Sequence, residues 1–301
     1  MGRLRDRYEA LLLDLDGTLY RGDAVIDGAP AALGVASAQR LLYVTNNASR
    51  RPEVVVEQLT GLGFVATPDD VVTSAQAAAR LLAERLGPGA QVLVVGADDL
   101  AAEIEAVGLR TVRRFEGAVP SAVVQGHSTN TGWADLAEAT YAIRAGALWV
   151  AANTDRTLPN ERGLAPGNGA MVAAVRAASD QEPLVAGKPY APLLEDALRR
   201  VGTRSALVVG DRLDTDIEGA DRVGLDSLLV LSGVSTLDNL RDAPPEQVPT
   251  YISDSLSALN HPPVEDEPDE SADLAERLRR HPGRAVPVRG TGVAATATEI
   301  R

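Results

Sequence analysis

Short apolar runs alternate along the chain with Ala/Leu/Glu/Arg-rich segments. The runs predict strands, namely Ala10–Leu13, Leu41–Thr45, Val71–Thr73, Gln91–Val95, Ala122–Gln125, Leu148–Ala152, Ala206–Val209 and Ser227–Leu231. The segments between them predict helices, namely Pro52–Leu62, Ala75–Leu86, Asp98–Val107, Trp133–Ala145, Gly169–Ser179 and Ala191–Val201. Alternation of this kind predicts an α/β fold, with a doubly wound, mostly parallel sheet covered by helices.

Composition narrows the class of protein. A chain of 301 residues suffices for one large or two medium domains. It contains no cysteine, which excludes disulfides, thiolate catalysis and cysteine zinc sites and is compatible with a reducing compartment. The net charge of −13 argues against nucleic acid and anionic membranes as partners. An anionic substrate is still compatible with this net charge if a metal ion and local hydrogen-bond donors determine the electrostatic potential at the site.

The N-terminal segment does not read as a targeting signal. Arg3, Arg5 and Arg7 precede three leucines, but Asp14 then interrupts the apolar run. That run is too short for a signal peptide, and no stretch of the chain approaches the length of a membrane span. We therefore expect a cytoplasmic protein.

The C-terminal segment differs in composition from the rest. Five of the six residues 265–270 are acidic, with prolines at 262, 263 and 268. This composition is typical of a linker or disordered segment. A short helix around Asp273–Arg280 is expected, and Arg284–Arg301 has no clear period. We expect an extension of unknown role from residue 261, an inert one rather than a docking segment.

Two carboxylates follow the first predicted strand directly. In extended backbone, side chains two residues apart point the same way, so Asp14 and Asp16 should converge. Like charges this close are unfavourable unless a cation or a shared proton offsets the repulsion. The pair therefore suggests a metal-dependent site. The alternative is a plain Asp-x-Asp-Gly turn that ends the strand.

Polar groups also follow other predicted strands. Thr45–Asn47 offers a hydroxyl and two amides, Lys188 precedes a helix, and Gly210–Asp216 carries three carboxylates. Each alone has a simpler explanation: a turn, a surface charge, a helix cap. In parallel sheets, however, ligands bind outside the carboxyl ends of the strands. We therefore expect these groups to meet Asp14 and Asp16 in one crevice.

The set resembles the haloacid dehalogenase superfamily of phosphotransferases, whose four motifs match Asp14–Thr18, Thr45, Lys188 and Gly210–Asp216. The first and second motifs lie 31 residues apart and the last two 23, which leaves room only for short connections. The 143 residues from Thr45 to Lys188 can hold a further domain. This spacing resembles the subgroup with a large cap, which contains phosphoglycolate, glycerol-3-phosphate, pyridoxal-phosphate and nitrophenyl-phosphate phosphatases.

Other stretches resemble that subgroup too, namely Asn153–Pro159, Gly167–Gly169 and Ser232–Thr236. One departure is Gln125–Ser128, where relatives tend to carry Gly-x-Asp, and it bears on substrate identity. The resemblance implies a core of residues 1–86 and 186–260 with an inserted α/β cap of residues 87–185. Residues 261–301 stay outside it.

The resemblance also implies roles for the motif residues. Asp14 would be the nucleophile that forms an aspartyl-phosphate, and Asp16 the general acid and base. Lys188 would stabilise the phosphoryl charge. The expected phosphoryl donors are Thr45 and Asn46, with Asn47 as a further candidate.

Magnesium would be held by the Asp14 carboxylate, the Asp16 backbone carbonyl and Asp211, with Asp216, and as a further candidate Asp214, orienting a metal-bound water or Lys188. Candidate selectors of the leaving group are Asp155, Arg156 and Asn160, although their loop can equally be a solvated turn.

The expected function is that of a Mg²⁺-dependent phosphomonoester hydrolase acting on a small phosphorylated metabolite. Glycerol 3-phosphate comes first and 2-phosphoglycolate second, with pyridoxal phosphate, nucleotides and aryl phosphates open. The alternatives are a phosphotransferase or mutase that uses the same aspartyl-phosphate, and a regulatory phosphometabolite-binding protein. The resemblance also suggests a homodimer formed through the cap.

Overall fold

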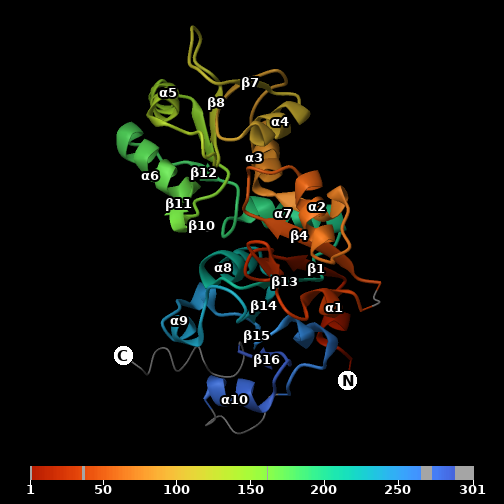
Figure 1. The fold of residues 1–301 in the computed structure, drawn as a ribbon. Helices are drawn as coiled ribbons and strands as arrows, with labels where there is room; N and C mark the ends of the chain where they lie inside the picture. The colour runs from red at the N-terminus through yellow and green to blue at the C-terminus, as the bar shows by residue number, and fades with distance from the viewer. Residues whose placement is uncertain (1, 36–37, 161, 266–272, 289–301) are drawn as a thin grey trace. The chain divides into compact units, whose positions relative to one another are not determined.

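The computed structural model describes residues 2–35, 38–160, 162–265 and 273–288 (Figure 1). The chain forms two compact units. The first combines Met1–Val44, Glu57–Asp70 and Ala197–Arg301, and the second combines Thr45–Val56 and Val71–Asp196. The expected cap of residues 87–185 falls within the second unit, which extends beyond it at both ends.

The sheet of the first unit carries apolar residues on both faces. Its strands stand in the order β16 (Val286–Pro287), β15 (Tyr251–Ser253), β14 (Asp226–Val230), β13 (Ala206–Gly210), β1 (Ala10–Leu13) and β4 (Arg40–Thr45). All neighbours are parallel except β16, which pairs antiparallel with β15. Every residue of β1 and β13 is buried, as expected for a parallel strand covered on both sides.

The second unit has a parallel sheet of its own, in the order β12 (Leu184–Val185), β9 (Leu148–Ala151), β8 (Ala122–Gln125), β6 (Gln91–Val95) and β7 (Arg110–Val112). Helices α5 (Trp133–Arg144) and α6 (Asn168–Ser179) lie together on one face (Figure 1). Ala139 and Val172 pack there against Val123 and Trp149 of the sheet. This apolar layer explains why the strands read as nearly continuous apolar runs.

The remaining described helices and strands complete the two units. The other helices are α1 (Ala29–Leu33), α2 (Pro52–Gly61), α3 (Ser74–Ala83), α4 (Asp98–Ala106), α7 (Ala191–Val201), α8 (Glu218–Arg222), α9 (Leu237–Arg241) and α10 (Leu274–Arg280). The other strands are β5 (Val71–Thr73) and the hairpins β2 (Tyr20–Arg21) with β3 (Ala24–Val25) and β10 (Thr157–Asn160) with β11 (Gly163–Pro166).

The α/β class is confirmed, and every strand and helix expected from the pattern is present with small shifts at the ends. The segment expected at 75–86, for example, forms α3 and ends at Ala83. The pattern did not give the strands β2, β3, β7, β10, β11, β12, β15 and β16, of two to four residues each, or the five-residue helices α1, α8 and α9. Runs this short carry too few positions for a period to show.

The C-terminal segment contributes to the first unit. The helix expected at Asp273–Arg280 is present as α10. The residues after it, for which no structure was expected, add β16 to the sheet, and Ala285, Val286 and Val288 are fully buried. Most of the acidic run, residues 266–270, lies outside the described residues.

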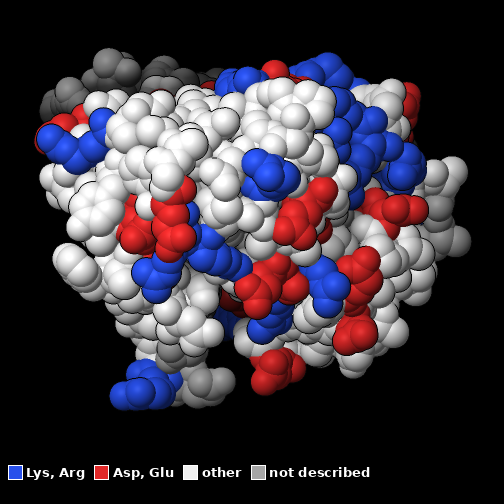
Figure 2. All heavy atoms as spheres, turned by 90° about the horizontal axis from the view of Figure 1, so that it is seen from above, with Lys and Arg blue, Asp and Glu red and all other residues white. Residues whose placement is uncertain are grey.

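No helix of the described residues is both long and apolar enough to cross a membrane. On the face drawn in Figure 2, basic and acidic side chains are interspersed, and wide areas carry neither.

Candidate active site

Three carboxylates of the first unit form a compact group. Asp14, Asp211 and Asp216 each place an oxygen within 4.8 Å of the other two. Strands β1 and β13 are parallel neighbours with Leu13 opposite Val209, so the residues that follow them emerge side by side. The Asp14 amide also donates to the Val209 carbonyl at 2.8 Å. The topology of the sheet thus brings together two acids almost 200 residues apart in sequence.

Asp211 is fully buried and is fixed by backbone groups. Its Oδ2 accepts a hydrogen bond from the Val234 amide at 2.6 Å. A Cβ at Gly17 or at Gly233 would overlap the Asp211 carboxylate, and Gly17 has φ of +92°, which favours glycine independently. The two glycines therefore leave the space that this carboxylate occupies.

Asp216 reaches the group through a π-helical turn at Leu213–Ile217. Its Oδ2 accepts a hydrogen bond from the Arg212 amide at 3.1 Å, and a Cβ at Gly210 would overlap it. Asp214 behaves differently. It is exposed and makes a bidentate contact with the Arg212 guanidinium at 3.0 and 2.8 Å. Asp216 thus stands beside Asp14 and Asp211, whereas Asp214 faces solvent.

Asp16 does not belong to this group of carboxylates. The extended backbone ends at Leu13, so the same-side rule that led us to pair Asp14 with Asp16 no longer governs the two side chains. Asp16 is exposed, and its Oδ1 accepts a long hydrogen bond from the Gly22 amide at 3.4 Å. The acids next to Asp14 are instead supplied by the segment after β13.

The three carboxylates fit a hard divalent cation. Mg²⁺ and Ca²⁺ prefer oxygen ligands, and all three side chains offer only oxygen. Asp211 and Asp216 are buried, where like charges this close repel strongly unless a cation offsets them. The chemistry of the donor set therefore suits the expected magnesium.

The second unit collects the other motif residues. Asn46 Oδ1 accepts a hydrogen bond from the Lys188 amide at 2.8 Å, and Asn46 Nδ2 donates to the Lys188 carbonyl at 3.0 Å. Thr45 is buried, and its Oγ1 accepts from the Asn47 amide at 3.1 Å. The Asn47 side chain instead shapes the following turn, because its Oδ1 accepts from the Ser49 amide at 2.8 Å.

The loop after β9 also contacts Asn46, whose Nδ2 donates to Asp155 Oδ1 at 3.2 Å. Arg156 is exposed, and Asn160 ends β10, with its side chain outside what the structure describes. The sequence motifs did not identify Asn153 as a site residue, although it lies in a stretch that resembles the subgroup. Its Nδ2 donates to the Asn46 carbonyl at 2.7 Å, so it anchors this loop beside Asn46.

Known proteins resemble this chain over most of its length. Residues 11–110 match the model of haloacid dehalogenase-like hydrolases, and residues 185–259 match a second, HAD-hydrolase-like model. A D-glycerol 3-phosphate phosphatase of Mycobacterium tuberculosis is 56% identical over 260 residues, which are 86% of this chain and 73% of the relative. The chain belongs to the haloacid dehalogenase-like hydrolases. The resemblance inferred from the motifs is thereby confirmed.

Other relatives of this hydrolase agree. A glycerol-3-phosphate phosphatase of Gallus gallus is 39% identical over 83% of this chain and 90% of its own length. An acid sugar phosphatase of Staphylococcus saprophyticus is 37% identical over 84% and 96%. A solved glycerol phosphate phosphatase of M. tuberculosis in complex with magnesium superposes with a TM-score of 0.85, at 48% identity over 99% of this chain and 93% of that one.

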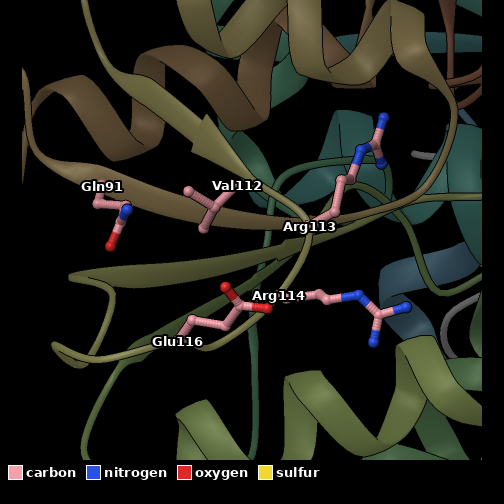
Figure 3. Close-up of a pocket in the computed structure, with 5 residues that line it drawn as sticks. All are labelled: Gln91, Val112, Arg113, Arg114 and Glu116. Atoms are coloured by element: carbon pink, nitrogen blue, oxygen red, sulfur yellow. The ribbon is translucent and has the colours of Figure 1, made fainter.

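A hollow of about 420 Å³ lies away from these motifs, at the β6–β7 edge of the second unit. Gln91, Val112, Arg113, Arg114 and Glu116 line it (Figure 3). The guanidinium groups of Arg113 and Arg114 point in different directions in this view. Arg113 is held by the Gly96 carbonyl at 2.8 Å and by Asp98 at 2.6 Å. We assign no ligand to this hollow.

Proposed function

We propose that this hydrolase is a Mg²⁺-dependent phosphomonoesterase that acts on a small phosphorylated metabolite, with glycerol 3-phosphate as the first candidate and 2-phosphoglycolate as the second. The observation that carries the proposal is the group of Asp14, Asp211 and Asp216 after neighbouring strands. The names of the relatives support the order of substrates, because phosphatases of glycerol 3-phosphate are among the similar proteins from both a bacterium and a bird.

Asp14 would attack the phosphorus atom in line. A bond forms between its carboxylate oxygen and phosphorus while the ester bond to the leaving oxygen breaks. Asp16 would protonate that leaving oxygen, and would then take a proton from the water that hydrolyses the aspartyl-phosphate and releases phosphate. The position of Asp16 outside the carboxylate group supports this role, since a proton carrier should not be occupied as a carboxylate ligand of a metal.

Asp14, Asp211 and the backbone carbonyl of Asp16 would hold the magnesium ion, with Asp216 directly beside them. When bound, the ion offsets the charge of the phosphate and of the carboxylates. Backbone amides fix Asp211 and Asp216, so the ligand set needs little rearrangement.

Thr45 and Lys188 would contact the phosphoryl oxygens, Thr45 through its hydroxyl and Lys188 through its ammonium charge. Both side chains are buried, which strengthens an electrostatic contact with an anion. Asp155 and Arg156 lie in the loop after β9 and remain candidates for selecting the leaving group, together with Asn160.

We further propose that the protein is cytoplasmic. We also propose that it forms a homodimer through the second unit. On α5, the solvent-exposed fraction is 80% for Trp133 and 55% for Tyr141. Aromatic side chains are enriched in the interfaces of protein assemblies. Light scattering after gel filtration should give twice the mass of the chain, and the double substitution Trp133→Ser with Tyr141→Ser should halve it. A monomer at every concentration would contradict the dimer.

A phosphate-release screen over small phosphomonoesters, with and without Mg²⁺, tests the proposed activity. We expect release that depends on Mg²⁺ and is highest for a three-carbon or two-carbon phosphate. Asp14→Asn should abolish it while the fold is retained, and residual turnover beyond what deamidation yields would refute the nucleophile. Phosphate transferred to an added alcohol would indicate a phosphotransferase, and binding without release would indicate a regulatory protein.

A further inference from the structure

Both the oxygen and the nitrogen of the Asn46 side-chain amide make hydrogen bonds within the second unit. Its Oδ1 accepts a hydrogen bond from the Lys188 amide at 2.8 Å. Its Nδ2 donates to the Lys188 carbonyl at 3.0 Å and to Asp155 Oδ1 at 3.2 Å. A carboxamide nitrogen has two N–H donors, and two acceptors lie within hydrogen-bond distance of it. The amide therefore has no donor to spare for the phosphoryl oxygens that the motif led us to expect as its partners.

The contact with Lys188 resembles one rung of an antiparallel sheet, because the amide bonds both backbone groups of a single residue. Gly187 brings the chain close enough for this. A Cβ there would lie 2.6 Å from Asn46 Oδ1 and 2.7 Å from the Ala152 carbonyl. The backbone of Lys188 is thus held in one place and one orientation.

Asn46 is itself held firmly. Its carbonyl accepts hydrogen bonds from Asn153 Nδ2 at 2.7 Å and from the Ser74 hydroxyl. Asn153 is buried, and its carbonyl in turn accepts from Asn168 Nδ2 at 2.7 Å. A side chain whose own backbone is anchored on two sides loses little further entropy when it fixes its partners.

We propose that Asn46 is a positioning residue that fixes the backbone of Lys188 and links it to the Asp155 carboxylate. The proposal rests on the function proposed above, in which Lys188 stabilises phosphoryl charge. A lysine carries its charge at the end of a flexible four-carbon chain, so the charge is placed only as well as the backbone that bears it. Through the same amide, the loop that carries Asp155 and the phosphate-holding lysine become parts of one hydrogen-bonded unit.

The Asp155 contact requires an amide at position 46. The substitution Asn46→Asp would keep the acceptor for the Lys188 amide but lose both donors. It would also set a second carboxylate against Asp155, which raises the pKa of one of the two. Asn46→Asp combined with Asp155→Asn exchanges donor and acceptor and restores one bond between the two side chains.

The experiment compares the full chain with Asn46→Ala, Asn46→Asp and the double exchange. Asn260→Ala is the matched control, since this half-buried amide also bonds a backbone carbonyl and a charged side chain but lies in the first unit. The readouts are the unfolding midpoint, kcat and KM with a phosphomonoester that the unmodified chain hydrolyses, and the affinity for inorganic phosphate with Mg²⁺.

We expect Asn46→Ala to lower kcat about 10- to 100-fold, the loss seen when hydrogen-bond partners that support metal ligands are removed, with a smaller change in KM. Asn260→Ala should match its loss of stability and keep the full kcat. The activity of Asn46→Asp relative to the unmodified chain should rise as the pH falls, because a protonated carboxyl can donate to Asp155. The double exchange should recover part of the lost kcat.

Equal kcat in Asn46→Ala and Asn260→Ala, from an active parent, would overturn the positioning role and leave the proposed function intact. A parent that releases no phosphate would instead refute the proposed function. In that case the affinity for inorganic phosphate decides the role of Asn46: weaker binding in Asn46→Ala than in Asn260→Ala supports it, and equal binding overturns it.

Discussion

The strand β16 should be indispensable to the stability of the first unit, although its sequence reads as part of an unstructured extension. Val286 of β16 and Val288, directly after the strand, are fully buried and packed with Ile252 of β15. The Val288 amide donates to the Thr250 carbonyl at 2.9 Å, and the Val264 amide donates to the Ala285 carbonyl at 2.8 Å. A chain that ends at Asn260 loses all of these contacts and exposes the edge of β15.

The magnitude follows from the burial of the two valines. Complete burial of such a side chain stabilises a fold by about 1.5–3 kcal/mol, so the pair contributes about 3–6 kcal/mol. This is an upper bound, since an unfolded chain already buries part of its apolar surface. Because whole domains are stable by only about 5–15 kcal/mol, the shortened chain should be close to unfolding at room temperature.

Urea unfolding followed by circular dichroism measures this, with separate fits for the two units if their transitions differ. The matched control ends at Val288, which removes residues 289–301 and keeps β16. Val286→Asp in the full chain provides a second test that removes no residue. If the chain ending at Asn260 has the same midpoint as the chain ending at Val288, the contribution of β16 is refuted.

Three further predictions concern the site and its surroundings. Gly233→Ala should weaken Mg²⁺ binding in calorimetry, because its Cβ would overlap the Asp211 carboxylate, whereas Gly61→Ala, where a Cβ meets open space, should not. Lys188→Ala should raise the barrier by about 3–4 kcal/mol, the worth of an oxyanion donor, and an unchanged kcat would count against its role. Burial lowers the pKa of His127, so the unfolded chain binds the proton more readily and stability falls as the pH drops below about 6.5. His127→Gln should flatten this decline of the unfolding midpoint, and an equal decline would contradict it.

The central strands could be predicted because burial on both faces makes their sequences apolar without interruption. Strand β1 with its four buried residues is an example. Strand β16 could not, because its two residues are defined by pairing with β15 and by no pattern of their own. The edges of a sheet are tertiary features, and local sequence carries little information about them.

The sequence predicted the acidic residues of the site better than it predicted the hydrogen bonds around them. The rule for the ends of parallel strands correctly indicated that Asp14 and Asp211 would be neighbours. It could not distinguish Asp214 from Asp216, since the choice depends on the π-helical turn that directs Asp216 inward. Nor could it show that the side-chain donors of Asn46 already have partners, because a sequence gives the donors of a residue but not their partners.

The glycines of the motifs and the acids of the group form one packing unit. Asp211 fills the space that Gly17 and Gly233 leave, and Asp216 fills the space beside Gly210. Backbone that approaches a carboxylate this closely fixes it more firmly than a flexible side chain could, because backbone amides lose no rotamer freedom on contact. Asp14 is less buried than the other two. The arrangement therefore combines two buried, firmly held acids with a third that is more accessible, which is compatible with the nucleophilic role proposed for Asp14.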